Sequence, residues 1–469
     1  MAGKKLTVFD AFFLAAETRE AMMHVGGLLI FSPPAGAHPQ LLRHLADELR
    51  QSVEIYPPWN LRLWTPEFLK NPLQAWLEEP NVDLEYHVRR SALPAPGDER
   101  ELGILVSRLH SVPIDFHRPP WEVHFIEGLE GGRFAMYFKI HHALVDGYTS
   151  MKLLARSLSH DPDDRDTPMF FARAPRARSI TREEADPAPT VERVLEAVRL
   201  QVGASREAGR AIMNVLRAQQ AGDRDLVAPM GAPRTLINRR ISRNRRFATQ
   251  QYPTERLRAL AKAGGGTIND VALSVCGGAL RRYLHEQGGL PAQGLTAMLP
   301  VNVRPKDDPG GGNAVGAILC ALATDIEDPR ARLATVVAST RRAKEQLAGM
   351  SRSAIMQYSA ALMAPLAMGQ VPTAANWMKP AFNVVVSNVP GPEQPLYFRG
   401  ARLDALYPLS IPYHGQGLNI TINSYVGTLN FGFTGCRDAV PSLQRLAVYS
   451  GDEVALLEQA LGLATAQAG

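Results

Sequence analysis

The chain of 469 residues is 45% hydrophobic and 21% charged, the composition of a globular protein large enough for two or three domains. It contains no run of 18 or more apolar residues, which argues against a membrane-spanning protein. Its three cysteines are far apart and odd in number, so we expect buried thiols in a reducing compartment, the cytoplasm.

The first residues, "MAGKKLTVFDAFFLAAE", are similar to a signal peptide because two lysines precede an apolar stretch. Asp10 interrupts that stretch before it reaches a working length, so we interpret it as mature protein. Further along, apolar spacing predicts strands at 22–31 and 84–93, helices at 38–53 and 99–112, and a hairpin at 121–140.

A basic stretch follows at 171–250, with 16 Arg and no Lys against 8 acidic residues. The net charge of the whole chain is only +5, so the basic excess is local. Within it, residues 191–202 have helical apolar spacing, which predicts a linker that becomes a helix. A solvated linker packed on the domains is one interpretation, and attraction to an anionic lipid surface is another. Nucleic acid fits less well, because aromatic residues are sparse and no groove-reading motif is present.

The second half of the chain again mixes strands with helices. Strands are predicted at 245–252, 295–303, 314–324, 381–389 and 427–435, and helices at 254–263, 268–285, 330–348 and 441–461. This order indicates an α/β fold of two lobes, at 1–170 and 241–469, joined by a linker at 171–240.

Two neighbouring histidines stand out in "FKIHHALVDGYTS", residues 138–150. Alternating apolar residues predict a strand up to residue 140, and helical spacing begins after Gly147, so the histidines lie in a strand-to-helix turn. A chance H-H-x-x-x-D-G is expected about once per thousand such sequences. Metal binding fits poorly, because neighbouring side chains leaving a strand point to opposite sides and no Cys/His cluster supplies further ligands.

The segment "HHALVDG" matches the HHxxxDG motif of the CoA-dependent acyltransferase superfamily. Further motifs are "PPWEVHFIEGL", "TINDVALSVCGGALRRYL", "PVNVRP" and "SNVPGP". Together with the opening residues, this ordered set resembles the bacterial wax ester synthase/diacylglycerol acyltransferase family over nearly the whole chain. One departure is Pro120, where the family usually has leucine before the tryptophan.

The resemblance implies two lobes similar to chloramphenicol acetyltransferase, with an active-site tunnel between them. It also implies transfer of a fatty acyl group from acyl-CoA to a long-chain alcohol or to diacylglycerol, with no cofactor and no metal. By the family pattern His142 is the general base, since an imidazole with a pKa of about 6.5 can accept the hydroxyl proton. The developing oxyanion needs fixed donors, either backbone N–H groups beside the turn or the side chain of Asn269. CoA leaves as a thiolate, so no covalent acyl-enzyme is required.

Three other motif residues have structural as well as catalytic interpretations. We expect His141 to support its neighbour by hydrogen bonding, because a single base suffices. Asp146 could orient His142, but the family pattern favours a salt bridge, with Arg304 as one partner. Gly147 either lets backbone approach the substrate or provides a positive φ for the turn.

Four residues of the second lobe are candidates for substrate binding. Asp270 forms a capping-box pattern with Thr267, which alone would explain it, whereas Asn269 in the same first turn could face an oxygen atom. Ser387 and Asn388 could equally be the end of a strand followed by a turn.

Two alternatives remain open. One is a non-catalytic lipid-droplet-binding protein on the same scaffold, against which the intact histidine motif argues. The other is an acyltransferase with a different acceptor, such as a polyketide alcohol or an amine. Because its acceptors are insoluble in water, we expect the protein on the inner membrane or on lipid droplets, held peripherally by the arginines at 173–246.

Overall fold

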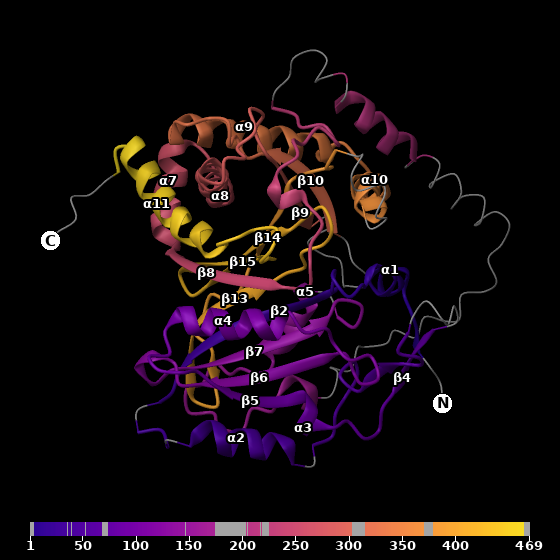
Figure 1. Cartoon of the computed structure of the whole chain (residues 1–469), viewed down its shortest axis with the longest axis vertical. Helices are drawn as coiled ribbons and strands as arrows, with labels where there is room; N and C mark the ends of the chain where they lie inside the picture. Colours follow the sequence, from indigo (N-terminus) through magenta and orange to yellow (C-terminus); the bar gives the residue numbers. More distant parts are fainter. Residues whose placement is uncertain are drawn as a thin grey trace.

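The computed structural model describes residues 4–34, 36–38, 40–51, 53–67, 74–145, 147–173, 203, 205–215, 217, 225–302, 315–369 and 379–463. They form two α/β lobes, each built around a six-stranded sheet (Figure 1). The lower lobe in that view is mostly indigo to magenta, from the first part of the chain, and the upper lobe is mostly pink to yellow. The predicted α/β fold of two lobes is confirmed.

The sheet of the first lobe has the order β12-β13-β2-β7-β6-β5. Its strands are β12 (Tyr397–Phe398), β13 (Ala401–Leu409), β2 (His24–Ser32), β7 (Phe134–His141), β6 (Trp121–Glu127) and β5 (Val88–Ala92). The helices of this lobe are α2 (Leu41–Arg50), α3 (Leu84–His87), α4 (Glu99–His110) and α5 (Gly147–Ala155). All pairs are antiparallel except β5 with β6. Central strand β7 is buried along its whole length, as expected for a strand covered on both faces.

One predicted strand, at 84–93, begins instead as the short helix α3. Asp83 precedes it, and its side chain accepts a hydrogen bond from the backbone N–H of Tyr86. This N-cap favours a helical turn before the chain extends into β5. The predicted strand at 22–31 and hairpin at 121–140 are confirmed by β2 and by β6 with β7.

The sheet of the second lobe has the order β10-β9-β11-β14-β15-β8. Its strands are β10 (Val315–Ala321), β9 (Thr296–Asn302), β11 (Val384–Val389), β14 (Leu418–Tyr425), β15 (Thr428–Cys436) and β8 (Arg245–Pro253). The helices are α7 (Thr254–Gly264), α8 (Ile268–Glu286), α9 (Pro329–Ala348), α10 (Arg352–Gly369) and α11 (Gln444–Ala460). The sequence did not predict α10, β13 or β14.

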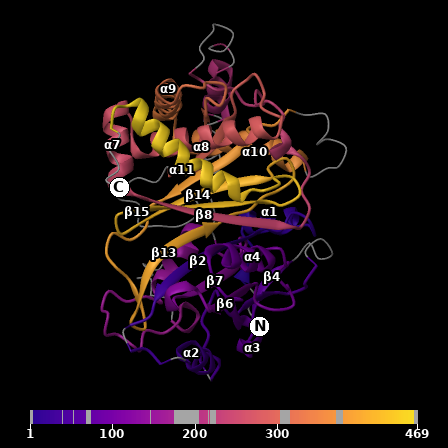
Figure 2. The same cartoon turned by 60° about the vertical axis from the view of Figure 1, so that its left-hand side comes forward.

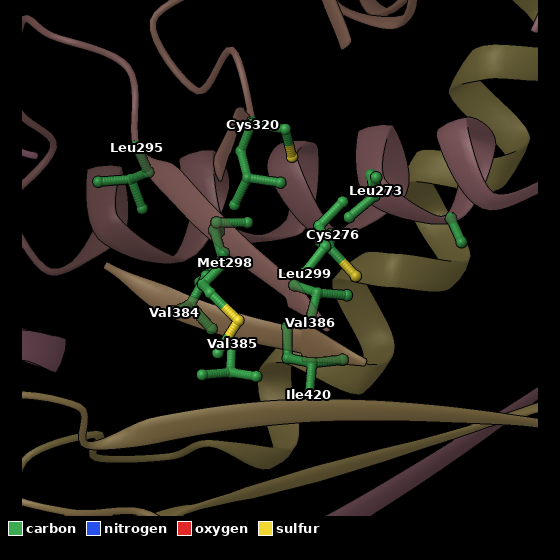
Figure 3. Close-up of a cluster of buried hydrophobic side chains, with 14 of the residues drawn as sticks. Leu273, Cys276, Leu295, Met298, Leu299, Cys320, Val384, Val385, Val386 and Ile420 are labelled. Carbon is green, nitrogen blue, oxygen red and sulfur yellow. The ribbon is translucent and has the colours of Figure 1, made fainter. Parts of the chain in front are cut away.

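Helix α8 supplies much of the core of the second lobe. Its Leu273 and Cys276 face the sheet residues Leu299 and Ile420, and all four are buried (Figure 3). The three cysteines are free and buried, as expected. Burial raises the pKa of the Cys276 thiol to about 12, so it stays protonated at neutral pH.

A third, small sheet lies beside the first lobe, in the order β1-β4-β3. Its strands are β1 (Lys4–Lys5), β4 (Ala75–Glu78) and β3 (Leu61–Leu63), and helix α1 (Val8–Ala16) packs on it through Leu14 and Trp76. Thr7 and Asp10 form a complete capping box at the start of α1. The indole N–H of Trp76 also donates to Asp10, so this carboxylate ties α1 to the sheet.

One strand from the later part of the chain joins the sheet of the first lobe. Strand β13 comes late in the sequence but pairs with β2 of the first lobe, beside which it lies in Figure 2. Residues 397–409, which fall within the predicted lobe at 241–469, thus join the sheet of the first lobe and cover an edge of β2 that would otherwise be unpaired.

Helix α4 makes a second connection between the lobes. Ser107 and Ser111 accept hydrogen bonds from the backbone N–H groups of Phe247 and Arg245, at 2.9 and 2.8 Å. Strand β8 is the edge of its sheet, so these serines cover donors that a neighbouring strand would otherwise take.

The linker helix predicted at 191–202 lies outside the described residues. Among the arginines that are described, Arg245 is buried and donates to the carbonyl oxygens of Ser242 and Glu20. It therefore does not contribute to an exposed basic surface. No helix within the described ranges is long and apolar enough to cross a membrane.

Candidate active site

The two histidines lie where β7 ends, ahead of helix α5. The backbone N–H of His141 donates to the carbonyl of Pro120, and that of His142 donates to the carbonyl of Met23, both at 2.9 Å. The first bond shows what Pro120 contributes at the position where the sequence resemblance leads us to expect leucine. It contributes a carbonyl, which proline keeps, so this contact survives the change.

His142 is half-buried and stacks on Phe13 of α1, with the ring centroids 3.9 Å apart and the planes 26° apart. Phe13 also packs against the core of the second lobe. The histidine therefore sits where α1, β7 and the second lobe meet. Its ring orientation is restricted by an aromatic neighbour that the sequence alone did not reveal.

The ring of His141 is fully buried and faces inward. Its Nδ1 accepts a hydrogen bond from the backbone N–H of Ala143 at 3.2 Å, which leaves the proton of the neutral ring on Nε2. That Nε2 lies 3.4 Å from a carboxylate oxygen of Glu17, and Phe116 packs against the ring edge. The buried ring of His141 thus stabilises the turn through contacts on its inner side, as expected for a residue that supports His142.

Glu17 is a site residue that the sequence did not single out. It ends α1, and its carboxylate accepts a hydrogen bond from the backbone N–H of Met23. Because the carbonyl of Met23 accepts from His142, this one side chain connects α1, the start of β2 and both histidines. The side chain of Glu17 is only 14% exposed, so water competes weakly for these bonds.

A buried ionic group lies behind the turn, on β6 and β7. The ammonium of Lys139 is 3.3 Å from Glu122 and donates to the carbonyls of Leu109 and Val112. Burial alone would raise the pKa of Glu122, but the hydrogen bond from His124 and the charge of Lys139 outweigh it and lower the pKa to about 2. The carboxylate is therefore ionised at neutral pH, and the group ties α4 to the sheet.

Two further buried histidines lie near the start of β2. His24 is the cross-strand partner of His141, and its Nε2 is 3.0 Å from the carbonyl of His110. The Nδ1 of His110 is 2.8 Å from the hydroxyl of Tyr137. Burial lowers the pKa of both His24 and His110 well below the usual value, so both rings are neutral at pH 7.

The candidates Asn269 and Asp270 lie in the first turn of α8, in the second lobe. Asp270 is buried, and its carboxylate accepts from the backbone N–H and hydroxyl of Thr267 and from the hydroxyl of Thr340, at 2.6–2.8 Å. Its oxygens are thus used in capping the helix and joining it to α9. Asn269 is half-buried.

A cleft of about 490 Å³ opens beside this turn. Gly265, Gly266 and Asp270 line one side, and Arg341, Lys344 and Glu345 of α9 line the other. The lining thus has two basic and two acidic residues, but the carboxylate of Asp270 is buried and already hydrogen-bonded. Exposed basic side chains and a helix N-terminus favour a negatively charged ligand.

Ser387 and Asn388 lie near the end of β11, where Ser387 is opposite Thr421 of β14. Ser387 is half-buried and Asn388 is exposed. The chain then turns through Pro390 and Gly391 toward the first lobe. A Cβ atom on Gly391 would lie 2.0 Å from the carbonyl oxygen of Ser424, so the close approach of these two segments requires glycine.

The structure therefore brings the histidines together with Gly147, which begins α5, while the other candidates lie in the second lobe. Asp146 and Arg304 lie outside the described residues, so their salt bridge stays a prediction. No group of three or more metal-binding side chains occurs in the described ranges.

This fold and this turn define a class of protein. The fold of two α/β lobes is shared with the first condensation domain of the CDA synthetase, at a TM-score of 0.58 and 20% identity over 99% of this chain and 97% of that one. At that identity the likeness shows the fold alone. The class of fold is therefore that of the condensation domains.

Within that class, the chain belongs to the wax ester synthase/diacylglycerol acyltransferase family. Residues 6–272 match the catalytic domain of this family and residues 311–458 match its C-terminal domain. The protein is thus an acyl-CoA-dependent O-acyltransferase, as the sequence motifs predict.

Named relatives cover the chain almost completely. A protein of Mycobacterium tuberculosis assigned as a diacylglycerol O-acyltransferase is 52% identical, over 98% of this chain and 99% of its own. The O-acyltransferase WSD of Acinetobacter baylyi is 39% identical over 97% of both chains. The structure of the wax ester synthase/diacylglycerol acyltransferase from Marinobacter aquaeolei is similar at a TM-score of 0.79 and 37% identity, over 98% of this chain and 100% of that one.

Proposed function

We propose that this enzyme transfers long-chain acyl groups from acyl-CoA to fatty alcohols and to diacylglycerol, with His142 as the general base. The observation that carries the proposal is the position of His142, half-buried at the junction of the lobes with its backbone anchored to Met23 and its ring stacked on Phe13. An imidazole held in this way needs no reorganisation to meet a hydroxyl group.

The proposed reaction is a direct transfer. The imidazole of His142 takes the proton of the acceptor hydroxyl while its oxygen attacks the thioester carbonyl. The tetrahedral intermediate then collapses, the C–S bond breaks, and the leaving CoA thiolate receives the proton from the imidazolium. Neutral His142 is regenerated, so the step balances without a covalent acyl-enzyme or a metal.

We propose that the cleft beside α8 binds the polar part of acyl-CoA. Phosphate groups there would meet Arg341, Lys344 and the N-terminal turn of α8. In this proposal the amide of Asn269 contacts substrate, whereas Asp270 shapes the cleft through its bonds to Thr267 and Thr340. We also propose that Ser387 and Asn388 bind substrate at the end of β11.

Replacing the base tests the mechanism. His142→Ala should lower turnover by about 10²- to 10⁴-fold while circular dichroism and acyl-CoA binding stay close to wild type. The matched control is His44→Ala, which removes an exposed histidine of α2 and should leave turnover unchanged. A folded His142→Ala protein with full activity would remove the base from the proposal.

An acceptor experiment tests the reaction itself. With palmitoyl-CoA alone we expect no release of free CoA thiol, and with hexadecanol or a diacylglycerol we expect thiol and ester in equal amounts. A burst of thiol without acceptor would indicate a covalent intermediate. Failure to react with either acceptor, despite acyl-CoA binding, would favour an enzyme for another alcohol or amine.

Peripheral binding to a lipid surface is also part of the proposal. Four arginines of the basic stretch are exposed just before β8: Arg234, Arg239, Arg240 and Arg243. Large apolar side chains are exposed on α1 and after β3, at Phe12 and Trp64. Flotation with anionic vesicles should therefore exceed flotation with neutral ones and decrease with salt. Equal binding to both would remove the electrostatic part.

A further inference from the structure

The segment between α1 and β2, residues 17–23, supports the histidine pair. The carboxylate of Glu17 lies 3.4 Å from Nε2 of His141, and the carbonyl oxygen of Met23 accepts a hydrogen bond from the backbone N–H of His142. The segment also closes on itself, because the backbone N–H of Met23 donates to the carboxylate of Glu17. Contacts that fix this segment therefore also fix the two histidines.

Later parts of the chain converge on one residue of this segment, Glu20. The buried guanidinium of Arg245, at the start of β8, donates to the carbonyl oxygen of Glu20 at 2.6 Å. The carboxylate of Glu20 lies 3.2 Å from the guanidinium of Arg240 and 3.5 Å from Nε2 of His414. We call these four residues, Glu20, Arg240, Arg245 and His414, the Glu20 clamp.

His414 lies where the chain passes from one sheet to the other. Strand β13 belongs to the first sheet and β14 to the second, and His414 lies between them with its side chain 1% exposed. Its Nδ1 accepts a hydrogen bond from the backbone N–H of Ile241 at 3.2 Å, so the neutral ring carries its proton on Nε2. The guanidinium of Arg240 lies 3.1 Å from that Nε2. The neutral ring therefore satisfies a donor of the second lobe and directs its own N–H toward the clamp.

The fold favours the neutral form of this ring. A second proton on Nδ1 would oppose the backbone N–H of Ile241, donor against donor. Among the described residues, the charged groups that act on the ring are the carboxylate of Glu20 and the guanidinium groups of Arg240 and Arg245. Burial and the charge of Arg240 lower the pKa of His414, and the charge of Glu20 only partly offsets this. The clamp is therefore complete at neutral pH and opens when the ring gains a proton in acid.

We propose that His414 and Glu20 are positioning residues, which connect the second lobe to the histidine turn. With the clamp closed, residues 17–23 keep the imidazole of His142 in place, and with the clamp open the fold remains but the imidazole shifts. This inference rests on the proposed function, because it takes His142 as the base. No clamp residue lines the cleft beside α8, so the clamp should affect kcat rather than the binding of acyl-CoA.

Two substitutions open the clamp from opposite sides. His414→Asn keeps an acceptor for the backbone N–H of Ile241, because Oδ1 of asparagine replaces Nδ1, but the shorter side chain does not reach Glu20. Glu20→Ala removes the carboxylate at an exposed position, where the fold should tolerate it. The matched control is Arg19→Ala, which shortens another exposed side chain of the same segment.

Each clamp variant should lower kcat about tenfold and leave KM for acyl-CoA within about twofold, because a displacement of about 1 Å can cost about 100-fold. The double variant should lose no more than either single variant, since both remove the same contact. Glu20→Gln keeps an acceptor oxygen and should retain most of the turnover, and Arg19→Ala should retain all of it. Hydrogen exchange of residues 17–23 should be faster in the clamp variants than in Arg19→Ala, a readout that needs no turnover.

The pH profile separates this role from a merely structural one. The ratio of the wild-type kcat to that of His414→Asn should be about ten above about pH 7 and decrease toward about pH 5, where the wild-type ring also leaves the clamp. Protonation of His142 affects both proteins equally and cancels in this ratio. A ratio that stays constant with pH would overturn the proposal.

Wild-type kcat in both clamp variants, additive losses in the double variant, or unchanged hydrogen exchange at residues 17–23 would also overturn it. The proposed function is tested separately. Full turnover of His142→Ala would overturn that function whatever the clamp variants show. An inactive His142→Ala protein beside fully active clamp variants would overturn the clamp and leave the function.

Discussion

Replacing Glu17 should separate the support of the histidine turn from the chemistry of the base. In Glu17→Ala, the buried backbone N–H of Met23 loses its acceptor, and Nε2 of His141 loses the carboxylate oxygen that lies 3.4 Å away. The loss of the acceptor costs about 1–3 kcal/mol, and because the Glu17 side chain is only 14% exposed, water replaces it poorly and the cost lies in the upper part of this range, about 2–3 kcal/mol.

That cost is small compared with the whole protein. An unfolding entropy of about 2.1 cal/mol/K per residue gives about 1 kcal/mol/K for 469 residues, so the Tm should fall by only about 2–3 °C. Turnover should respond more strongly, because Met23 and His141 position His142. A displacement of about 1 Å at the reacting atoms can cost about 100-fold, so we expect kcat to fall about 10- to 100-fold with KM for acyl-CoA nearly unchanged.

Glu17→Gln is the informative companion variant. Its amide oxygen can still accept from the backbone N–H of Met23 and still lies beside His141, so it should keep most of the turnover. The matched control is Glu85→Ala, which removes an exposed carboxylate in the first turn of α3. The kcat, the KM for acyl-CoA and the Tm are measured for Glu17→Ala, Glu17→Gln and Glu85→Ala and compared with the wild-type values. Wild-type kcat in Glu17→Ala, or equal losses in the alanine and glutamine variants, would refute this reasoning.

Three further predictions concern stability. The pKa values of His24 and His110 are lower in the folded protein than in the unfolded chain, so the unfolded chain binds protons first as the pH falls. The free energy of unfolding should therefore be at its full value above about pH 6.5 and decrease below it. A Tm that stays constant from about pH 7.5 to 5 would contradict this. Lys139→Met should cost about 3–5 kcal/mol by leaving Glu122 without its buried cation, and adding Glu122→Gln should recover part of the lost Tm. Ser107→Ala should cost about 1–3 kcal/mol, measured by denaturant unfolding, since it uncovers an edge N–H of β8; no change would show that water replaces the serine.

The histidine turn was predictable because all its signals are local. Alternation up to residue 140, helical spacing after Gly147 and the motif between them lie within 13 residues, and the structure has β7 and α5 in those places. The capping box of α8 was equally readable from Thr267 and Asp270. A similar signal at Thr7 and Asp10 begins α1, but resemblance to a signal peptide obscured it.

The parts that could not be predicted depend on contacts between distant segments. Nothing in 401–409 indicates that this strand pairs with β2, because Leu403 and its partner Phe31 are separated by most of the chain. The same holds for Glu17 beside His141, because these two residues are separated by 123 residues of chain. The catalytic and substrate-binding roles of the motif residues stay predictions for the experiments above.

The late strand β13 has a consequence for synthesis of the protein. The ribosome completes β7 at residue 141, but the neighbour of β2 on its other side ends at residue 409. At about 5–20 residues per second, the intervening chain takes roughly 15–50 seconds to appear. During that time the edge of β2 has no partner from its own chain, which makes this nascent sheet a candidate client for chaperones. Pulse proteolysis of stalled ribosome complexes should detect protection of β2 only after residue 409 has emerged.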